Sequence, residues 1–102
     1  MTTYVLVHGA WHGGWCWNKT SPLLRASGSE VFVPTLTGLG ERAHLNDRIN
    51  PADITLDVHI RDVVQLIYYE GLHDVVLVGH AYAGMVITGA VSYTHLTLPT
   101  KA

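Results

Sequence analysis

The feature that most constrains the fold is a set of three short apolar runs, each with hydrophobic side chains at consecutive positions. They are YVLV at 4–7, VFV at 31–33 and VVLV at 75–78. Consecutive rather than alternating apolar residues are typical of strands that are buried on both faces, as in a parallel sheet. The stretches between the runs are long enough for the crossover helices that parallel strands need. The sequence therefore predicts an α/β fold with three parallel strands and right-handed crossover helices.

The stretch after the first apolar run predicts a helix over residues 17–26. Its apolar side chains fall near one face, and Gly28 ends it. Because Pro22 lies in its first half, the regular part is expected to begin at Ser21, with Ser21 as the N-cap. The polar stretch 35–52 is long for a connection, and such loops are often functional or mobile.

A second helix is predicted over residues 56–70, where apolar side chains recur at helical spacing. Asp53 or Thr55 is its expected N-cap. Another apolar segment begins at Met85, after a tight turn, and predicts a further helix. Three strands form a thin sheet with two open edges. We therefore expect the domain to continue beyond this chain.

Composition excludes several classes of protein. Hydrophobic residues make up 48% of the 102-residue chain and charged residues 14%, which excludes a disordered chain. The net charge is −2 and the basic residues are scattered, so no nucleic-acid surface is expected. Cys16 is the single cysteine and is expected to be buried and unreactive. No apolar run approaches the roughly 20 residues of a membrane span, and no signal peptide is recognisable, which favours a soluble, cytoplasmic chain.

No metal or cofactor is expected. The chain has seven histidines, and His8 and His12 are four residues apart, but the glycines between and after them argue against a helix. The other histidines have no acidic or cysteine partner at ligand spacing. Gly38 and Gly40 follow a strand but complete no phosphate-binding motif.

The strongest local signal is the segment GHAYAGM at 79–85, directly after the third apolar run. A strand that enters a turn of small residues and then an apolar helix is the setting of a nucleophile elbow, G-x-S-x-G. Ala81 occupies the nucleophile position here, and it has no hydroxyl with which to react. On this motif alone, a plain turn of a parallel sheet remains an alternative.

A second motif, HGAWHGGW at 8–15, follows the first apolar run. A Gly-rich loop at this place supplies one backbone N–H to an oxyanion hole, and the residue after the nucleophile supplies the other. By position these donors are the N–H groups of Ala10 and Tyr82. Both loops are expected to meet at the carboxyl ends of neighbouring strands, where open α/β sheets bind ligands. The candidate substrate-binding residues are Gly9, Trp11 and His80.

Together with PTLTGLGERAH at 34–44, these motifs resemble the N-terminal half of the α/β-hydrolases. The resemblance covers residues 1 to about 90 and is greatest to bacterial esterase-like members of the hydroxynitrile lyase and plant methyl-ester esterase group. It implies a Ser-His-Asp triad that acts on carboxylic esters, or on cyanohydrins in the lyase branch. It also implies that the Asp and His lie far downstream, so that this chain is a truncated N-terminal fragment. His80 is not expected to be the general base. Because Asp57, Asp62 and Asp74 lie on or beside the second predicted helix, none of them is assigned to the triad.

The last twelve residues, VSYTHLTLPTKA at 91–102, differ in origin from the rest by this interpretation. The codons GTC TCT TAT ACA CAT CTG ACG CTG CCG ACG encode residues 91–100 and resemble the adapter end of transposon-based sequencing libraries. We therefore expect residues 1–90 to be the N-terminal part of a hydrolase domain and residues 91–102 to be an artefactual tail. The alternative is a genuine strand, because 91, 93, 95 and 97 would alternate.

Three hypotheses for function follow. The first is an inactive fragment of a serine esterase that acts on a small-molecule ester-like substrate, with a hydroxynitrile lyase-like parent as a variant. The second is a pseudo-hydrolase that binds a small ligand, which Ala81 favours. The third is a chain with no stable fold or function of its own, because unpaired sheet edges would expose apolar surface. The sequence predicts no oligomeric state.

Overall fold

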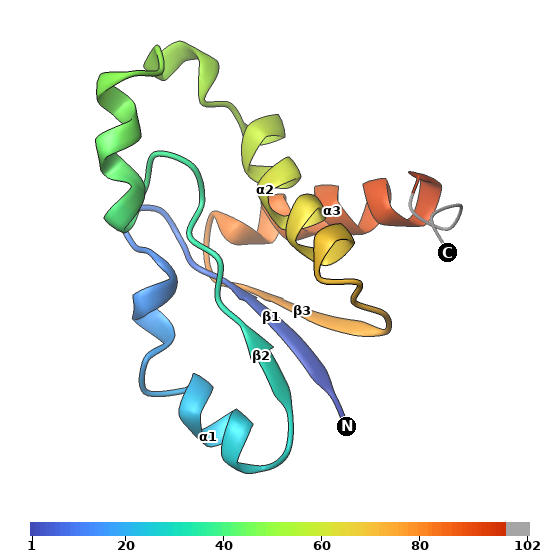
Figure 1. The fold of residues 1–102 in the computed structure, drawn as a ribbon. Coiled ribbons are helices and arrows are strands. Elements are labelled where there is room, and N and C mark those ends of the chain that lie inside the picture. The colour runs from blue at the N-terminus through green and yellow to red at the C-terminus, as the bar shows by residue number, and fades with distance from the viewer. Residues whose placement is uncertain (98–102) are drawn as a thin grey trace.

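The computed structural model describes residues 1–97, and the side chains of residues 1–93. Three strands form one parallel sheet: β1 (Thr3–Val7), β2 (Glu30–Phe32) and β3 (Val75–Gly79). Their order is β2-β1-β3, with β1 in the middle (Figure 1). The predicted three-stranded parallel sheet with intervening helices is confirmed within the described part of the chain. The expectation that the third apolar run is buried on both faces is wrong: β3 is an edge strand among the described residues, none of its residues is fully buried, and Val76 is 42% exposed.

The strand order determines where a ligand can approach. The chain passes from β1 to β2 on one side and then crosses to β3 on the other, so the connections run in opposite directions from β1. Open α/β sheets bind ligands at such a switch point, beyond the carboxyl ends of the strands. Here that point lies beyond Val7 of β1 and Gly79 of β3, which are paired in register.

Three α-helices accompany the sheet: α1 (Ser21–Ala26), α2 (Leu56–Tyr69) and α3 (Ala83–Thr97). Helices α2 and α3 pack against each other beside β3, whereas α1 lies beside β2 and away from both (Figure 1). The main core lies between the sheet and the α2/α3 pair. Its fully or nearly buried members are Val5, Val7, Leu36, Val63, Val64, Ile67, Ala83, Val86 and Ala90.

The N-terminus of α2 agrees with the sequence. Of the two predicted N-caps, Asp53 and Thr55, the structure shows Thr55. Its Oγ1 accepts a hydrogen bond from the N–H of Val58 at 3.4 Å. A hydroxyl in this position satisfies one of the donors that a helix N-terminus leaves unpaired. The helix then runs to Tyr69, one residue short of the prediction.

The region before α1 differs from the prediction of one helix over 17–26. Gly14–Trp17 form a short 3₁₀ segment, and α1 begins at Ser21, which confirms the expected start of the regular part. Thr20 is the N-cap instead of Ser21, since Pro22 suits the first turn and places Ser21 inside the helix, where it is buried. Cys16 was expected to be buried, but its place in the 3₁₀ segment leaves it exposed.

The polar stretch at 35–52 is not structureless, because it contains 3₁₀ segments at Gly40–Asp47 and Pro51–Asp53. Helix α3 begins at Ala83, two residues before the predicted start. It continues through 91–97, where no glycine or proline interrupts it, so the alternative of a strand in that segment is wrong. The interpretation of 91–102 as an artefactual tail stays a prediction, and residues 98–102 lie outside the described residues.

Candidate active site

The turn between β3 and α3 has the backbone geometry of a nucleophile elbow. Ala81 has φ 55°, in the left-handed region that L-residues with a side chain rarely adopt. Three hydrogen bonds secure the turn: His80 N–H to the carbonyl of Val7 (3.1 Å), Ala83 N–H to that of His80 (3.0 Å), and Gly84 N–H to that of Ala81 (2.9 Å). The turn therefore holds residue 81, which is exposed, in a strained conformation at the end of β3.

Small residues allow this turn to be so sharp. A Cβ added at Gly79 would lie 2.8 Å from the carbonyl oxygen of Ala83, where no side chain fits. Ala83 itself is fully buried at the first position of α3. The expectation that strand and helix approach closely at this motif is confirmed.

The loop after β1 lies directly against the elbow. A Cβ added at Gly9 would lie 2.9 Å from His80 Nδ1 and 3.4 Å from the Cβ of Ala81. The two loops therefore meet at the carboxyl ends of β1 and β3, as the motifs predict. Any larger residue at position 9 would push the loop away from the elbow, because core contacts this short cannot be accommodated without movement.

The predicted donors are available at this junction. Within residues 1–97, neither the N–H of Ala10 nor that of Tyr82 donates a hydrogen bond, although their neighbours in both loops do. Ala10 is exposed and Tyr82 is half-buried. An unpaired N–H group is free to donate to the oxygen of a ligand.

The remaining predicted site residues lie around the same junction. The ring of His80 is exposed and lies 6.2 Å from that of His12, centroid to centroid, in an edge-to-face arrangement. Trp11 has φ 70°, and its side chain is 91% exposed. The structure thus brings Gly9, His80 and Ala81 together, whereas the indole of Trp11 projects from the loop toward solvent.

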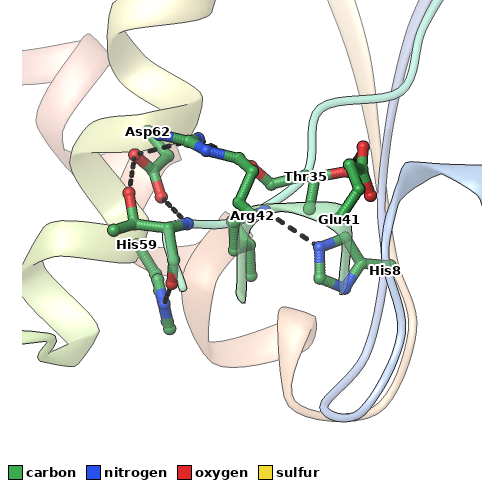
Figure 2. Close-up of polar contacts among 8 residues, drawn as sticks. His8, Thr35, Glu41, Arg42, His59 and Asp62 are labelled. Atoms are coloured by element: carbon green, nitrogen blue, oxygen red, sulfur yellow. Dashed lines mark hydrogen bonds and ion pairs between the residues drawn. The ribbon is translucent and has the colours of Figure 1, made fainter. Parts of the chain in front are cut away.

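A network of buried polar side chains, which the sequence analysis did not assign, lies beneath these loops (Figure 2). His8 is completely buried, and its Nε2 accepts a hydrogen bond from the N–H of Leu36 at 2.9 Å. Its Nδ1 lies 2.7 Å from the carbonyl oxygen of Gly9, which can only accept, so Nδ1 carries the proton. Burial lowers the pKa of His8 below its usual 6.5, which agrees with a neutral ring of this tautomer.

His59 of α2 makes a second pair of contacts. Its Nε2 lies 2.9 Å from the carbonyl oxygen of Thr37 and therefore carries a proton. Its Nδ1 lies 2.8 Å from the hydroxyl of Tyr82, whose ring meets the imidazole edge to face. Burial raises the pKa of Tyr82, so the phenol keeps its proton and can donate it to this contact.

Both histidines contact the segment Thr35–Leu36–Thr37, which begins three residues after the end of β2 and is buried. Asp62 of α2 accepts hydrogen bonds from the N–H (2.6 Å) and the hydroxyl (2.8 Å) of Thr37. Arg42 lies 4.0 Å from Asp62 and donates to the carbonyl of Thr35 at 2.8 Å. Asp62 thus holds the segment in place. Its role here is structural, in agreement with the expectation that it is not a triad residue.

The hydroxyl of Thr35 connects the segment to the loop above it. It donates to Oε2 of Glu41 at 2.7 Å and accepts from the N–H of Gly14 at 2.8 Å. The hydrogen bond from Thr35 is the main reason that the pKa of Glu41 is lowered. Most polar groups of the segment thus have a partner, as buried polar groups generally do.

One sequence signal could have revealed this network. His59 lies four and eight residues before Val63 and Ile67, so it shares the buried face of α2. A histidine on an apolar face needs hydrogen-bond partners for its ring nitrogens. Those partners, Thr37 and Tyr82, lie more than 20 residues before and after His59, and periodicity cannot identify them.

Other types of site are not found in the described residues. No group of three or more metal-ligating side chains occurs there. No helix there combines the length and the apolar character needed to cross a membrane. The cytoplasmic location stays a prediction.

With this geometry in view, the class of protein can be stated. The sequence matches the alpha/beta hydrolase family over residues 4–99, and the chain belongs to that family. It is 56% identical over 89 residues to the carbendazim hydrolyzing esterase of Nocardioides sp. (strain SG-4G), covering 87% of this chain and 35% of the relative. It is 38% identical over 86 residues to methylesterase 9 of Arabidopsis thaliana, covering 83% and 32%. The chain therefore spans about a third of the length of these relatives.

Solved structures agree with this assignment. An extracellular alpha/beta-hydrolase from a Paenibacillus species superposes with a TM-score of 0.79 at 28% identity, over 93% of this chain and 36% of that one. A methylesterase from Arabidopsis superposes with a TM-score of 0.73 at 35% identity, over 89% and 37%. The predicted α/β-hydrolase fold and the resemblance to the esterase group are confirmed.

Proposed function

We propose that this chain is the N-terminal part of an esterase-like α/β-hydrolase that acts on small-molecule esters. We further propose that the N–H groups of Ala10 and Tyr82 form its oxyanion hole. The observation that carries the proposal is the left-handed Ala81 at the end of β3, with the loop of Gly9 packed against it. In a nucleophile elbow of this kind, residue 81 and the two N–H groups would face the same space.

The chemistry of an intact serine version follows from this placement. A hydroxyl at position 81 would attack the ester carbonyl, and the two N–H groups would stabilise the oxygen that becomes negatively charged. Ala81 has no hydroxyl. The chain as written therefore does not hydrolyse esters by a Ser-His-Asp mechanism. The names of its relatives, an esterase that hydrolyses carbendazim and a methylesterase, favour small esters as the substrate class.

The runner-up is a pseudo-hydrolase that binds a small ester-like ligand without hydrolysing it. A single observation favours it, which is that alanine occupies the nucleophile position while the elbow keeps its strained geometry. The oxyanion donors would then hold a ligand oxygen rather than a reaction intermediate.

The test uses the product of the complete source gene, sequenced through codon 81 and past codon 90. That product is compared in two forms, with serine and with alanine at position 81, for hydrolysis of p-nitrophenyl acetate. We expect the serine form to exceed the alanine form by at least about 10⁴-fold in kcat/KM. Equal rates in the two forms would overturn the esterase proposal. An alanine codon in an intact gene whose product binds benzoate would favour the pseudo-hydrolase.

A further inference from the structure

We propose that the buried histidines His8 and His59 are positioning residues, each of which holds one of the two candidate oxyanion donors. The inference rests on the proposed function, because it assumes that Ala10 and Tyr82 supply the N–H groups. It adds that these donors are oriented by a shared buried segment, Thr35–Leu36–Thr37, rather than by the surface loops alone.

His8 acts on the peptide group that carries the donor. The carbonyl of Gly9 and the N–H of Ala10 belong to one peptide unit, and the described chain has no cis peptide bond. In a trans peptide the N–H points opposite to the carbonyl. The hydrogen bond from His8 Nδ1–H draws the Gly9 carbonyl into the protein, so the N–H of Ala10 is turned outward.

The N–H of Leu36 in turn determines the tautomer and the orientation of the His8 ring. The N–H of Leu36 donates to Nε2, so this nitrogen must be unprotonated and Nδ1 must carry the proton. The ring is fully buried and cannot rotate to other partners without leaving a polar group unpaired. The segment after β2 thereby determines the direction of the Ala10 donor.

His59 acts on the second donor through the side chain of Tyr82. The hydroxyl of Tyr82 lies 2.8 Å from His59 Nδ1, and the two rings pack edge to face at 5.6 Å. This contact anchors the residue that directly follows Ala81 to helix α2. The other nitrogen of His59 contacts the carbonyl of Thr37, the next residue after Leu36.

The two histidines therefore connect both donors to adjacent residues of one segment. Asp62 clamps that segment through both the N–H and the hydroxyl of Thr37. The relative position of the two donors thus depends on a common support. Preorganised donors stabilise an oxyanion more effectively than donors that must reorient.

The first measurement is the tautomer of each ring, from ¹⁵N NMR of the histidine-labelled product of the complete source gene. We expect His8 to be protonated at Nδ1 and unprotonated at Nε2, and His59 to be protonated at Nε2. Rings that exchange between tautomers, or that have the opposite ones, would overturn the inference. This measurement needs no variant, so it stands even if a substitution prevents folding.

The second measurement follows the amide signals of Ala10 and Tyr82 while benzoate is added as an oxyanion probe. We expect both signals to shift in the unsubstituted protein. His8→Gln should displace the free-state signal of Ala10, and Tyr82→Phe, which removes only the hydroxyl, should displace that of Tyr82. Each change should weaken benzoate binding by about three- to tenfold, the range of a single hydrogen bond. His73→Gln, at an exposed histidine before β3, is the matched control and should change neither signal.

The outcomes separate the two proposals. If benzoate shifts neither amide in the unsubstituted protein, the oxyanion hole itself is wrong, and the inference falls with it. If benzoate shifts both amides but His8→Gln and Tyr82→Phe bind it as tightly as the control, only the positioning role is wrong. If His8→Gln displaces the Ala10 signal, Tyr82→Phe displaces the Tyr82 signal, and each weakens benzoate binding, the oxyanion hole and the positioning role are both supported.

Discussion

At the scale of the single residue, the most informative position is Ala81. It is one of three non-glycine residues with positive φ in the described chain, with Trp11 and Asp74. Trp11 lies in the loop after β1, and Ala81 lies in the turn after β3. Two unfavourable backbone conformations thus occur in the two loops that meet at the candidate site. Such strain persists only where the surrounding structure enforces it, and it is concentrated at functional sites.

The strain at Ala81 predicts an unusual effect of glycine. A left-handed conformation costs an L-residue about 1–2 kcal/mol, whereas glycine adopts it freely but loses about 0.5–1 kcal/mol of entropy. We therefore expect Ala81→Gly to raise the free energy of unfolding by up to about 1 kcal/mol in the product of the complete source gene. Urea unfolding measures this change.

Ala83→Gly is the matched control, two residues away in the first turn of α3 and fully buried. In helical geometry the same substitution should lower the free energy of unfolding by about 1 kcal/mol. If both substitutions are destabilising to the same extent, residue 81 is not strained in solution.

At the scale of elements, the segment Thr35–Leu36–Thr37 after β2 connects the loop that follows β1 with helix α2. It contacts His8, the residue directly after β1, and His59 and Asp62 of α2. The sequence predicted β2 and α2 with small errors in their bounds. It left the segment between them as a polar loop, because its partners are set by packing rather than by local pattern.

This arrangement predicts that stability falls on acidification. Burial lowers the pKa of His8 in the folded state. Below about pH 6.5, His8 is therefore protonated in the unfolded chain but remains neutral in the folded chain until the pH falls to its lowered pKa. The stabilising contribution is full above that pH and is lost as the pH falls toward the lowered pKa. Burial is the largest cause of the lowered pKa; the hydrogen bond to Gly9 and the charge of Glu41 oppose it, and His12 and His59 reinforce it.

The measurement is urea unfolding at several values between about pH 5 and 8, where histidines titrate. We expect His8→Gln to reduce the dependence of the unfolding free energy on pH relative to the unsubstituted protein. The lowered pKa of Glu41 acts only below its usual 4.5, where that carboxyl begins to be protonated, so this range excludes it. An unchanged dependence in His8→Gln would show that the ring does not titrate as the structure implies.

At the scale of the whole molecule, much apolar surface remains uncovered in the described part of the chain. The sheet there has three strands, so the outer edges of β2 and β3 have no pairing strand among residues 1–97. Large exposed apolar side chains include Met1, Leu23, Val76 and Met85. Open edges and apolar patches of this kind promote association.

We therefore expect the 102-residue chain on its own to associate and to bind a dye for exposed apolar surface, such as anilinonaphthalene sulfonate. The product of the complete source gene is the comparison and should bind much less dye per chain. Light scattering and dye fluorescence at equal protein concentration measure the difference. A monomeric 102-residue chain with a cooperative thermal transition would contradict this expectation.

The sequence by itself determined the succession of strands and helices along the chain and the sharp turn at 79–84, because these depend on local properties. Consecutive apolar residues specify strands, and Gly79 and Ala83 leave room for strand and helix to approach. Only the tertiary structure decided that β1 lies between β2 and β3, that Cys16 is exposed, and which nitrogen of His8 carries the proton. Each of these depends on which distant segments come into contact, and no local pattern encodes that choice.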